Sequence, residues 1–322
     1  MLTIDSATVA AVPGLQELAA VQTAHFHTSD PRLPVASHLP SWMILPPGGA
    51  GWLAYEDDCL IGALCAEPEF WPSESPFANV FPRDYLRLRL ILDPAASAAA
   101  TLPPLLDRLD GWFRGVNTPG RMLMLPARDA VLTAAMQAEG FTPYHVIAHQ
   151  PLPEKFTGLS PSNIAIREAD DGDIPVIVEM VAESWRFHAR YQPAIEISAH
   201  LLPSCVRQTR QMLGDGQRQT ILLAEIAGQT VGFFAIGISV QDSRARPALF
   251  RSGHYGDIYE VGVRTSYRRS GIGAALFQEA CCWFRRQCVA GLFVNYAPTN
   301  PTSSRFWPKL GFADAWVNWW RS

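Results

Sequence analysis

The chain repeats itself about half-way along, and this internal repeat constrains the fold more than any other feature of the sequence. Similar residue groups recur at an offset of 170 or 171, namely Leu53-Ala54 and Leu223-Ala224, Ile61-Gly62 and Val231-Gly232, Trp112-Phe113-Arg114 and Trp283-Phe284-Arg285, and Gly140-Phe141 and Gly311-Phe312. A nearly constant offset over such a span indicates that one folding unit has been duplicated. The length of 322 residues also suits two domains better than one.

The segment between the two copies has the composition of a linker. Residues 150–161 are rich in proline, glycine and serine, which are typical of connecting segments. We therefore predict a first domain over residues 1–152 and a second domain over residues 164–322.

The hydrophobic pattern of the second domain alternates between strands and helices. Strands are expected at 164–167, 220–225, 230–239, 257–264, 291–296 and from 313 onward, and helices at 174–187, 195–211, 271–288 and 301–310. Residues 240–254 are expected to widen the connection before the central strand. Interleaving of this kind predicts an α/β (α+β) fold in which a mixed sheet is covered by helices.

Composition excludes several classes of protein. Hydrophobic residues make up 48% and charged residues 17% of a chain with a net charge of −4, which indicates a globular protein and argues against a nucleic-acid partner. We expect no membrane partner, because no apolar run is long enough to cross a bilayer. The N-terminal residues lack the basic region of a signal peptide, so a cytoplasmic location is expected. The cysteines and histidines lack zinc-ligand spacing, so no metal site is expected.

The most informative stretch is a strand that leads through a glycine-containing turn into a helix. Gly271 and Gly273 stand where the helix should begin, and Arg268 and Arg269 precede them. The first N–H groups of a helix are unpaired and carry partial positive charge, so this turn can hold a phosphate group. The stretch is no Walker loop, because it lacks Gly-Lys-Ser/Thr. A dinucleotide-binding fingerprint would need a glycine where Leu276 stands.

Two motifs give the second domain a resemblance to a known family. Arg268-x-x-Gly271-x-Gly273 is similar to the first signature of the GNAT (GCN5-related N-acetyltransferase) superfamily. The segment from Asn300 to Phe312, which ends in Leu310-Gly311-Phe312, resembles its second signature. The resemblance spans residues 257–312, and with the repeat it implies two tandem GNAT-like domains, each a mixed, mostly antiparallel sheet flanked by helices.

The resemblance implies acetyl-CoA as the cofactor. The backbone of Val261, Gly262 and Val263 would hold the pantetheine arm, and an amide near Val261 would polarise the thioester. Amides from Arg268 to Ala274 would hold the pyrophosphate, and Asn300 would bind the pantetheine. The expected cofactor-binding residues are Val261, Gly262, Val263, Arg268, Arg269, Ser270, Gly271, Ile272, Gly273, Ala274, Asn300, Ser303 and Trp307.

The first domain lacks these features. Residues Ser97 to Leu102 replace the arginines and glycines of the turn, and Pro103 and Pro104 stand where the helix should offer its amides. Asp129 replaces Asn300, and its negative charge would repel an anionic cofactor. We therefore interpret the first domain as a degenerate copy with a structural or substrate-shaping role.

The candidate catalytic residues are Glu260, Asp257 and Tyr296. An amine must lose a proton before it attacks, and Glu260 or Asp257 could accept that proton. Side chains alternate along a strand, so only one of the two should face a given cleft unless a bulge intervenes. The tyrosine that usually acts as the acid in this family is replaced by Trp307, which leaves Tyr296, Tyr259, Ser303 or solvent as proton donors.

The sequence thus predicts an acetyl-CoA-dependent N-acetyltransferase that acts on a primary amine of a small molecule or peptide. Two alternatives stay open, namely a non-catalytic CoA-binding or interaction protein and an acyltransferase that uses another acyl-CoA. The region of Trp185, Arg186, His188, Arg190 and Tyr191 is a candidate acceptor pocket. No residue indicates the oligomeric state.

Overall fold

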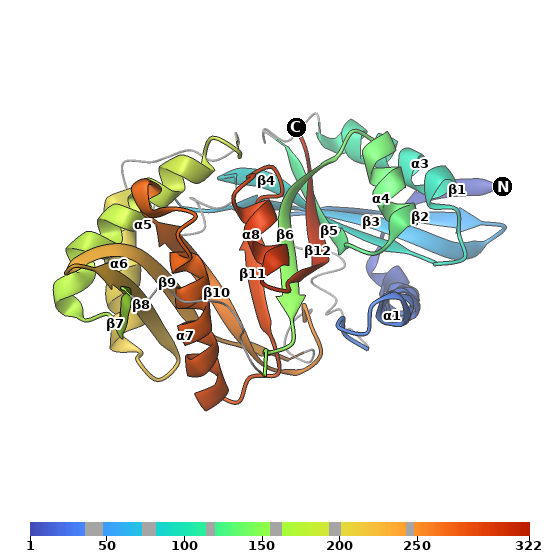
Figure 1. The fold of residues 1–322 in the computed structure, drawn as a ribbon. Coiled ribbons are helices and arrows are strands. Elements are labelled where there is room, and N and C mark those ends of the chain that lie inside the picture. Colours follow the sequence, from blue (N-terminus) through green and yellow to red (C-terminus); the bar gives the residue numbers. More distant parts are fainter. Residues whose placement is uncertain (36–47, 73–81, 114–119, 155–162, 193–200, 243–247) are drawn as a thin grey trace.

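The described strands form one continuous mixed sheet that runs through both halves of the chain. The structure is a computed structural model, and it describes residues 1–35, 48–72, 82–113, 120–154, 163–192, 201–242 and 248–322. The sheet has 12 strands in the order β1-β2-β3-β4-β5-β12-β6-β11-β10-β9-β8-β7 (Figure 1). We call residues 1–152 the first half and residues 164–322 the second half.

The repeat seen in the sequence is visible in the element bounds. The strands are β1 (Leu2–Ser6), β2 (Ala50–Glu56), β3 (Cys59–Phe70), β4 (Asp84–Leu92), β5 (Arg121–Pro126), β6 (Thr142–Gln150), β7 (Ala165–Glu168), β8 (Gln219–Ile226), β9 (Gln229–Gln241), β10 (Gly253–Val263), β11 (Leu292–Tyr296) and β12 (Ala313–Arg321). The α-helices are α1 (Val12–Ser29), α3 (Ala98–Phe113), α4 (Ala130–Ala138), α5 (Ile174–His188), α6 (Leu201–Gly214), α7 (Ile272–Arg286) and α8 (Ser303–Lys309). Short 3-10 turns occupy Val9–Ala11, Asp171–Asp173 and Thr265–Tyr267.

Each half gives its last strand to the other half. Strand β12 of the second half pairs with β5 and β6 of the first half. Strand β6 of the first half pairs with β12 and with β11 of the second half. The sequence placed the strand from Ala313 onward in the second domain, but among the described strands this one pairs only with strands of the first half. The two exchanged strands lie side by side in the centre of the molecule (Figure 1).

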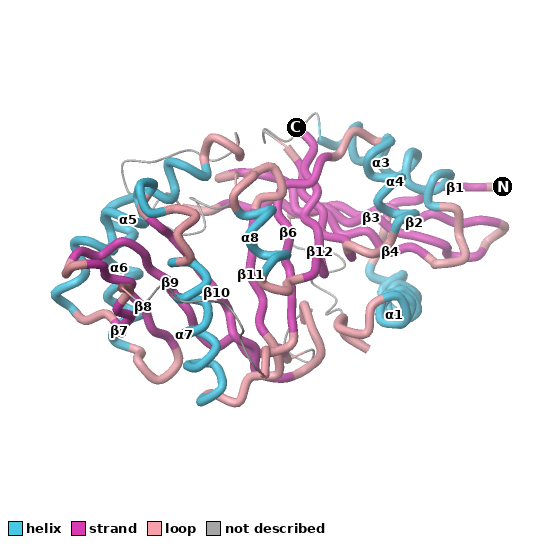
Figure 2. The backbone as a smooth tube through the Cα atoms, in the orientation of Figure 1, coloured by secondary structure: helices cyan, strands magenta, loops and turns pink. Residues whose placement is uncertain are grey.

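Helices cover both faces of this sheet (Figure 2). In the first half, α1 packs on one face against β2, β3 and β4, while α3 and α4 pack on the other. In the second half, α5 and α6 cover one face and α7 and α8 cover the other. The predicted fold class is thereby confirmed. None of the described helices is long and apolar enough to span a membrane.

Several predicted elements differ in extent from the observed ones. Residues 240–254 were expected to be a connection, but β9 continues to Gln241 and β10 begins at Gly253. Between them, Leu249 and Phe250 pack into a cluster on the central strands. The first residues of the helix expected at 195–211, and most of the expected linker, lie outside the described residues.

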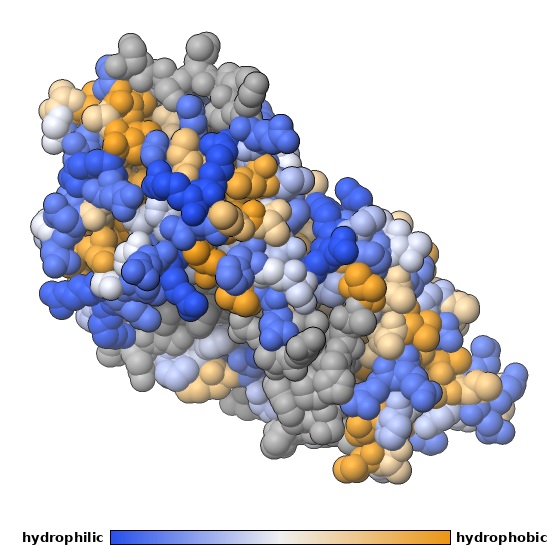
Figure 3. Space-filling model, turned by 90° about the horizontal axis from the view of Figure 1, so that it is seen from below, coloured by the Kyte–Doolittle hydropathy of each residue, from blue (hydrophilic) through white to orange (hydrophobic). Residues whose placement is uncertain are grey.

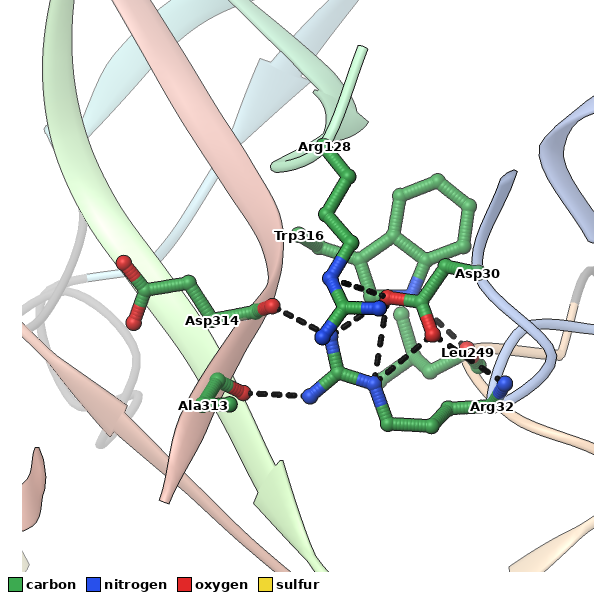
Figure 4. Close-up of polar contacts among 7 residues, drawn as sticks. All are labelled: Asp30, Arg32, Arg128, Leu249, Ala313, Asp314 and Trp316. Carbon is green, nitrogen blue, oxygen red and sulfur yellow. Dashed lines mark hydrogen bonds and ion pairs between the residues drawn. The ribbon is translucent and has the colours of Figure 1, made fainter. Parts of the chain in front are cut away.

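Arg32, held by a buried ion pair with Asp30, links the first half to the start of β12 (Figure 4). Asp30, which is 1% exposed, binds the guanidinium of Arg32. Arg32 in turn donates to the carbonyl oxygens of Ala313 and Asp314, at 2.7 and 2.5 Å. Arg128 lies 3.6 Å from the same carboxylate. Burial alone would raise the pKa of Asp30, but the hydrogen bonds from Arg32 outweigh it, and the pKa lies below its usual value.

The described surface seen from below offers no large apolar face. Hydrophobic side chains there form small areas separated by hydrophilic ones (Figure 3). Scattered apolar side chains of this kind are normal on a protein surface.

Candidate active site

Strands β10 and β11 separate after a short paired stretch. They pair in parallel over three residues, from Gly256 to Ile258 on β10. Beyond that point β10 continues to Val263, paired with β9. Backbone groups of Val261 and Val263 thus lie on a stretch of β10 that no longer pairs with β11, where the sequence predicted the pantetheine arm.

A β-bulge in β10 brings the two candidate bases to one face. Ile258 pairs with Ile236 and Glu260 pairs with Ala235, so Tyr259 is the extra residue. Ile258 packs into the cluster beneath α7, which places Asp257 on the opposite, α5 side of the sheet. Glu260 also lies on that side, because its side chain contacts α5. The expected separation of Asp257 and Glu260 by strand alternation does not hold, since the bulge reverses it.

Glu260 has the surroundings of a general base. The hydroxyl of Ser184 on α5 donates to its carboxylate at 2.7 Å. Burial raises the pKa of Glu260 to about 7, although the hydrogen bonds from Ser184 and from the backbone of Val261 oppose the rise. Burial also raises the pKa of Asp257, to about 8. Both carboxyl groups can therefore exchange protons near neutral pH.

The turn before α7 presents a row of unpaired amides. Gly271 has a φ of 89°, in the left-handed region that favours glycine, and Arg269 has a φ of 65°. Among the described residues, the N–H groups from Arg269 to Ala274 have no acceptor, and the amide of Ala275 is the first to bond within the turn. Ser270 donates its hydroxyl to the carbonyl of Tyr267 at 2.6 Å and so keeps the turn closed.

The two arginines of the turn differ in their contacts. The guanidinium of Arg268 lies 4.4 Å from the ring centroid of Phe187 on α5, and its Nε donates to the carbonyl of Val263. Arg269 is exposed at the surface. Gly273 faces α8, where an added Cβ would lie 3.1 Å from the ring of Phe306. The glycine therefore also permits close packing between the turn and α8.

The second signature forms a tight loop around a buried amide. Asn300 is 1% exposed, and its Oδ1 accepts from the amide of Thr302. Its Nδ2 lies 3.3 Å from Nδ1 of His188. The hydroxyl of Ser303 bonds to the carbonyls of Ala297 and Asn300. In this structure both side chains hold the loop that leads from β11 to α8.

Two expected cofactor-binding side chains are core residues instead. Trp307 is 2% exposed and packs against the rings of Phe234 and Phe312. Ile272 is 1% exposed and belongs to the same cluster. Their side chains offer no surface to a ligand here, so only the backbone amide of Ile272 stays a candidate contact.

Tyr296 lies apart from the two carboxyl groups. Its hydroxyl donates to Asp314 at 2.8 Å, and its ring packs in the cluster under α7. Glu260 lies on the other face of the sheet. Tyr259, by contrast, is 38% exposed, and its hydroxyl lies near Gly237, the residue paired with Asp257. Of the tyrosines considered as proton donors, Tyr259 therefore shares the face of Glu260.

Sequence reasoning did not find the part of α5 that joins these groups. Ser184, Phe187 and His188 contact Glu260, Arg268 and Asn300 respectively. Their spacing of three and four residues places them on one helix face, which is a signal that the sequence contained. Of the residues predicted to form the acceptor pocket, His188 is the one with a described contact to Glu260, Arg268 or Asn300.

The corresponding turn of the first half is closed by its own cap. Helix α3 begins at Ala98, and Ser97 accepts from the amides of Ala100 and Thr101. Pro103 and Pro104 were expected at the start of this helix, but they lie inside it because it begins earlier. Asp129, in the place of Asn300, caps α4 by accepting from the amide of Leu132.

A cavity remains between α3 and α4. Its volume is about 470 Å³. The lining is mostly alanine, with Leu102, Pro103, Val131 and Glu139.

Comparison with known proteins finds a family match in the second half and a curated relative. Residues 181–312 match the model of the acetyltransferase (GNAT) family. An uncharacterized N-acetyltransferase of Archaeoglobus fulgidus is 29% identical over 144 residues, which are 44% of this chain and 88% of that protein.

Two solved structures share the fold over the whole chain. A GCN5-related N-acetyltransferase from Sphaerobacter thermophilus has a TM-score of 0.62 at 18% identity and covers 99% of this chain and 95% of its own. A tandem GNAT protein from the clavulanic acid biosynthesis pathway has a TM-score of 0.52 at 14% identity and covers 100% and 98%. At these identities the two structures establish the fold alone.

The fold of the whole chain is that of tandem GNAT proteins. Residues 181–312 match the acetyltransferase (GNAT) family, and over part of its length the chain is similar to an N-acetyltransferase. Proteins of this family generally use acetyl-CoA and act on amine acceptors.

Proposed function

We propose that the second half binds acetyl-CoA and transfers its acetyl group directly to a primary amine of a small molecule or peptide. The observation that carries this proposal is the row of unpaired amides from Arg269 to Ala274, beside the point where β10 and β11 separate. The same turn in the first half is capped by Ser97, so the first half has no equivalent row. We infer that the first half does not bind the cofactor.

The residues present fit such a cofactor. The amides of the turn, with the exposed Arg269, would hold the pyrophosphate. The backbone of β10 near Val261 and Val263, which pairs with β9 but no longer with β11, would hold the pantetheine arm. When bound there, acetyl-CoA supplies an activated acyl group on a thiol leaving group of pKa about 8.5.

The chain's own residues would then prepare the acceptor. Glu260, with a pKa of about 7, takes the proton from the ammonium group and so frees the nitrogen lone pair. Asp257 is the alternative base, since it lies on the same face. A backbone N–H of β10 near Val261, whose own amide bonds to Glu260, would be the donor for an oxyanion. Tyr259 or solvent would supply the proton that a thiol leaving group needs.

A non-catalytic CoA-binding protein is the second candidate. It is favoured by the burial of Trp307 at the usual position of the family's tyrosine.

The domain limits of 1–152 and 164–322 stay predictions.

One experiment separates the two candidates. CoA affinity is measured by calorimetry, and thiol release from acetyl-CoA is followed over a panel of polyamines, amino acids, aminoglycosides and peptides. The proposal expects turnover with at least one acceptor, and a loss of about 10² to 10³ in kcat for Glu260→Gln with unchanged CoA affinity. CoA binding without turnover of any acceptor would favour the non-catalytic protein.

A second pair of variants tests the position of the cofactor. The double variant Arg268→Glu with Gly271→Pro should weaken CoA binding at least tenfold, because it adds a negative charge and a proline to the turn. Ser97→Ala at the matching place of the first half is the control and should leave CoA affinity unchanged. Unchanged affinity in the double variant would refute the site.

A further inference from the structure

The exchange of strands places His145 of the first half on the sheet face that carries Asp257 and Glu260 of the second half. His145 lies on β6, next to β11 in the sheet, and it is 4% exposed. It lies on the same face as Ile147, which is the face opposite the cluster under α7. This is also the face of Asp257 and Glu260.

His145 contacts the segment that follows α5. Its Nε2 makes a hydrogen bond with Nε2 of Gln192, a residue that is 3% exposed. The same segment is held from the other side, because Thr299 donates its hydroxyl to the carbonyl of Tyr191 at 2.8 Å. The end of α5 is thus fixed between the exchanged strand of the first half and the loop before Asn300.

Three successive strands anchor one face of α5 and its continuation. Ser184 contacts Glu260 on β10, His188 contacts Asn300 after β11, and Gln192 contacts His145 on β6. The spacing of four residues keeps Ser184 and His188 on one face of the helix, with Gln192 just beyond its end. A buried polar pair such as His145 and Gln192 costs free energy if either partner is lost, so it fixes one arrangement of this segment.

We propose that His145 is a positioning residue of the acceptor site. Through His145 the degenerate first half fixes the position of α5, and α5 in turn holds Ser184 against Glu260. The inference rests on the proposed function for its link to the acceptor. Its structural part, the connection from His145 to His188, does not need a known acceptor.

The kinetic test uses His145→Gln and His145→Leu in the full chain, with an amine from the panel that the unaltered protein acetylates. We expect the KM for that amine to rise about tenfold, while the Kd for CoA stays within twofold. His149→Gln is the matched control, because His149 lies on the same strand and face, is 8% exposed, and stacks on Phe250 at the far end of β6. The control should leave the KM for the amine unchanged. An amine KM within twofold of the unaltered protein in both His145 variants would overturn the proposal. A rise in the Kd for CoA as large as the rise in the amine KM would also overturn it.

Two measurements keep the test independent of turnover. A double-mutant cycle of His145→Leu and Gln192→Leu, read by chemical unfolding, should show that the two changes are not additive. The ring signals of His188 in NMR spectra should shift and titrate at a different pH in His145→Gln, and should be unchanged in His149→Gln. Additive stabilities together with unchanged His188 signals would refute the proposal even if the protein acetylates no amine in the panel. Absence of turnover in the unaltered protein would count against the proposed function instead.

Discussion

At the scale of single residues, the pKa of Glu260 is set by two opposing effects. Burial raises the pKa to about 7, and the hydrogen bond from Ser184 lowers it. A carboxylate in this position is ionised, and so able to accept a proton, only at pH values above its pKa. Its function as a base should therefore depend on its partner on α5.

We predict that kcat/KM falls as the pH decreases through about 7, because Glu260 becomes protonated. In Ser184→Ala the pKa of Glu260 should rise, and the fall should begin at a higher pH. The pH dependence of thiol release from acetyl-CoA measures both curves. Because Asp257 has a pKa of about 8 and shares the face, Asp257→Asn is the comparison variant. A fall near pH 7 that persists in Glu260→Gln would assign the base to another group.

His149 gives a second prediction at this scale. Burial and the nearby Arg32 lower the pKa of His149 to about 4, against about 6.5 in an unfolded chain. Between these values the unfolded chain binds a proton that the folded protein does not, so stability is lost as the pH falls from about 6.5 to about 4. The raised pKa values of Glu260 and Asp257 act in the opposite direction.

The comparison of the unaltered protein with His149→Gln isolates this effect. The difference in the free energy of unfolding between the two should move in favour of the variant by about 1.4 kcal/mol per pH unit over that range. Chemical unfolding at several pH values provides the measurement. A difference that does not change with pH would show that His149 is not held neutral in the folded state.

At the scale of elements, hydrogen bonds from Arg32 join the segment after α1 to the start of β12. Arg32 satisfies both the buried carboxylate of Asp30 and two backbone carbonyls of β12 (Figure 4). Those carbonyls lie at the start of the strand, where Asp314 and Trp316 flank a register shift. The contact therefore secures an irregular strand end.

We predict that Arg32→Met lowers the free energy of unfolding by about 3 kcal/mol, because it leaves the carboxylate of Asp30 buried without its main partner. Arg128→Met is the matched control, since the side chain of Arg128 is 53% exposed and touches the same carboxylate from outside. The control should change stability by less than about 1 kcal/mol. Equal losses in the two variants would contradict the role given to Arg32.

At the scale of the whole molecule, the exchange of β6 and β12 makes the halves depend on each other. Without the first half, β11 would lose β6, its partner on the side away from β10, and β12 would lose both of its neighbours. Unpaired strand edges and buried backbone groups without partners are costly.

We therefore predict that residues 164–322 produced alone do not fold to a stable monomer, and that co-production with residues 1–152 restores a one-to-one complex. Circular dichroism and sedimentation analysis of the separate and combined halves provide the measurement. Cooperative unfolding of residues 164–322 as an isolated monomer would show that β12 can find other partners within its own half.

The sequence by itself determined the duplication, the fold class and the family signature. Glycines at 271 and 273, the loop of Asn300 and the loss of these features in the first half are local patterns, and local backbone geometry follows from them. The burial of Trp307 was not predicted, because a side chain at this position of the motif can line a cleft or pack in the core.

The tertiary structure alone decided where the exchanged strands lie and which groups meet around α5. Strands β6 and β12 have equivalent positions in the repeat, so their patterns fit either half equally well, and only the long-range pairing distinguishes them. The bulge at Tyr259 likewise depends on the register with β9. Contacts of this kind join residues far apart in the chain, which is the physical reason that the pattern of one segment could not indicate them.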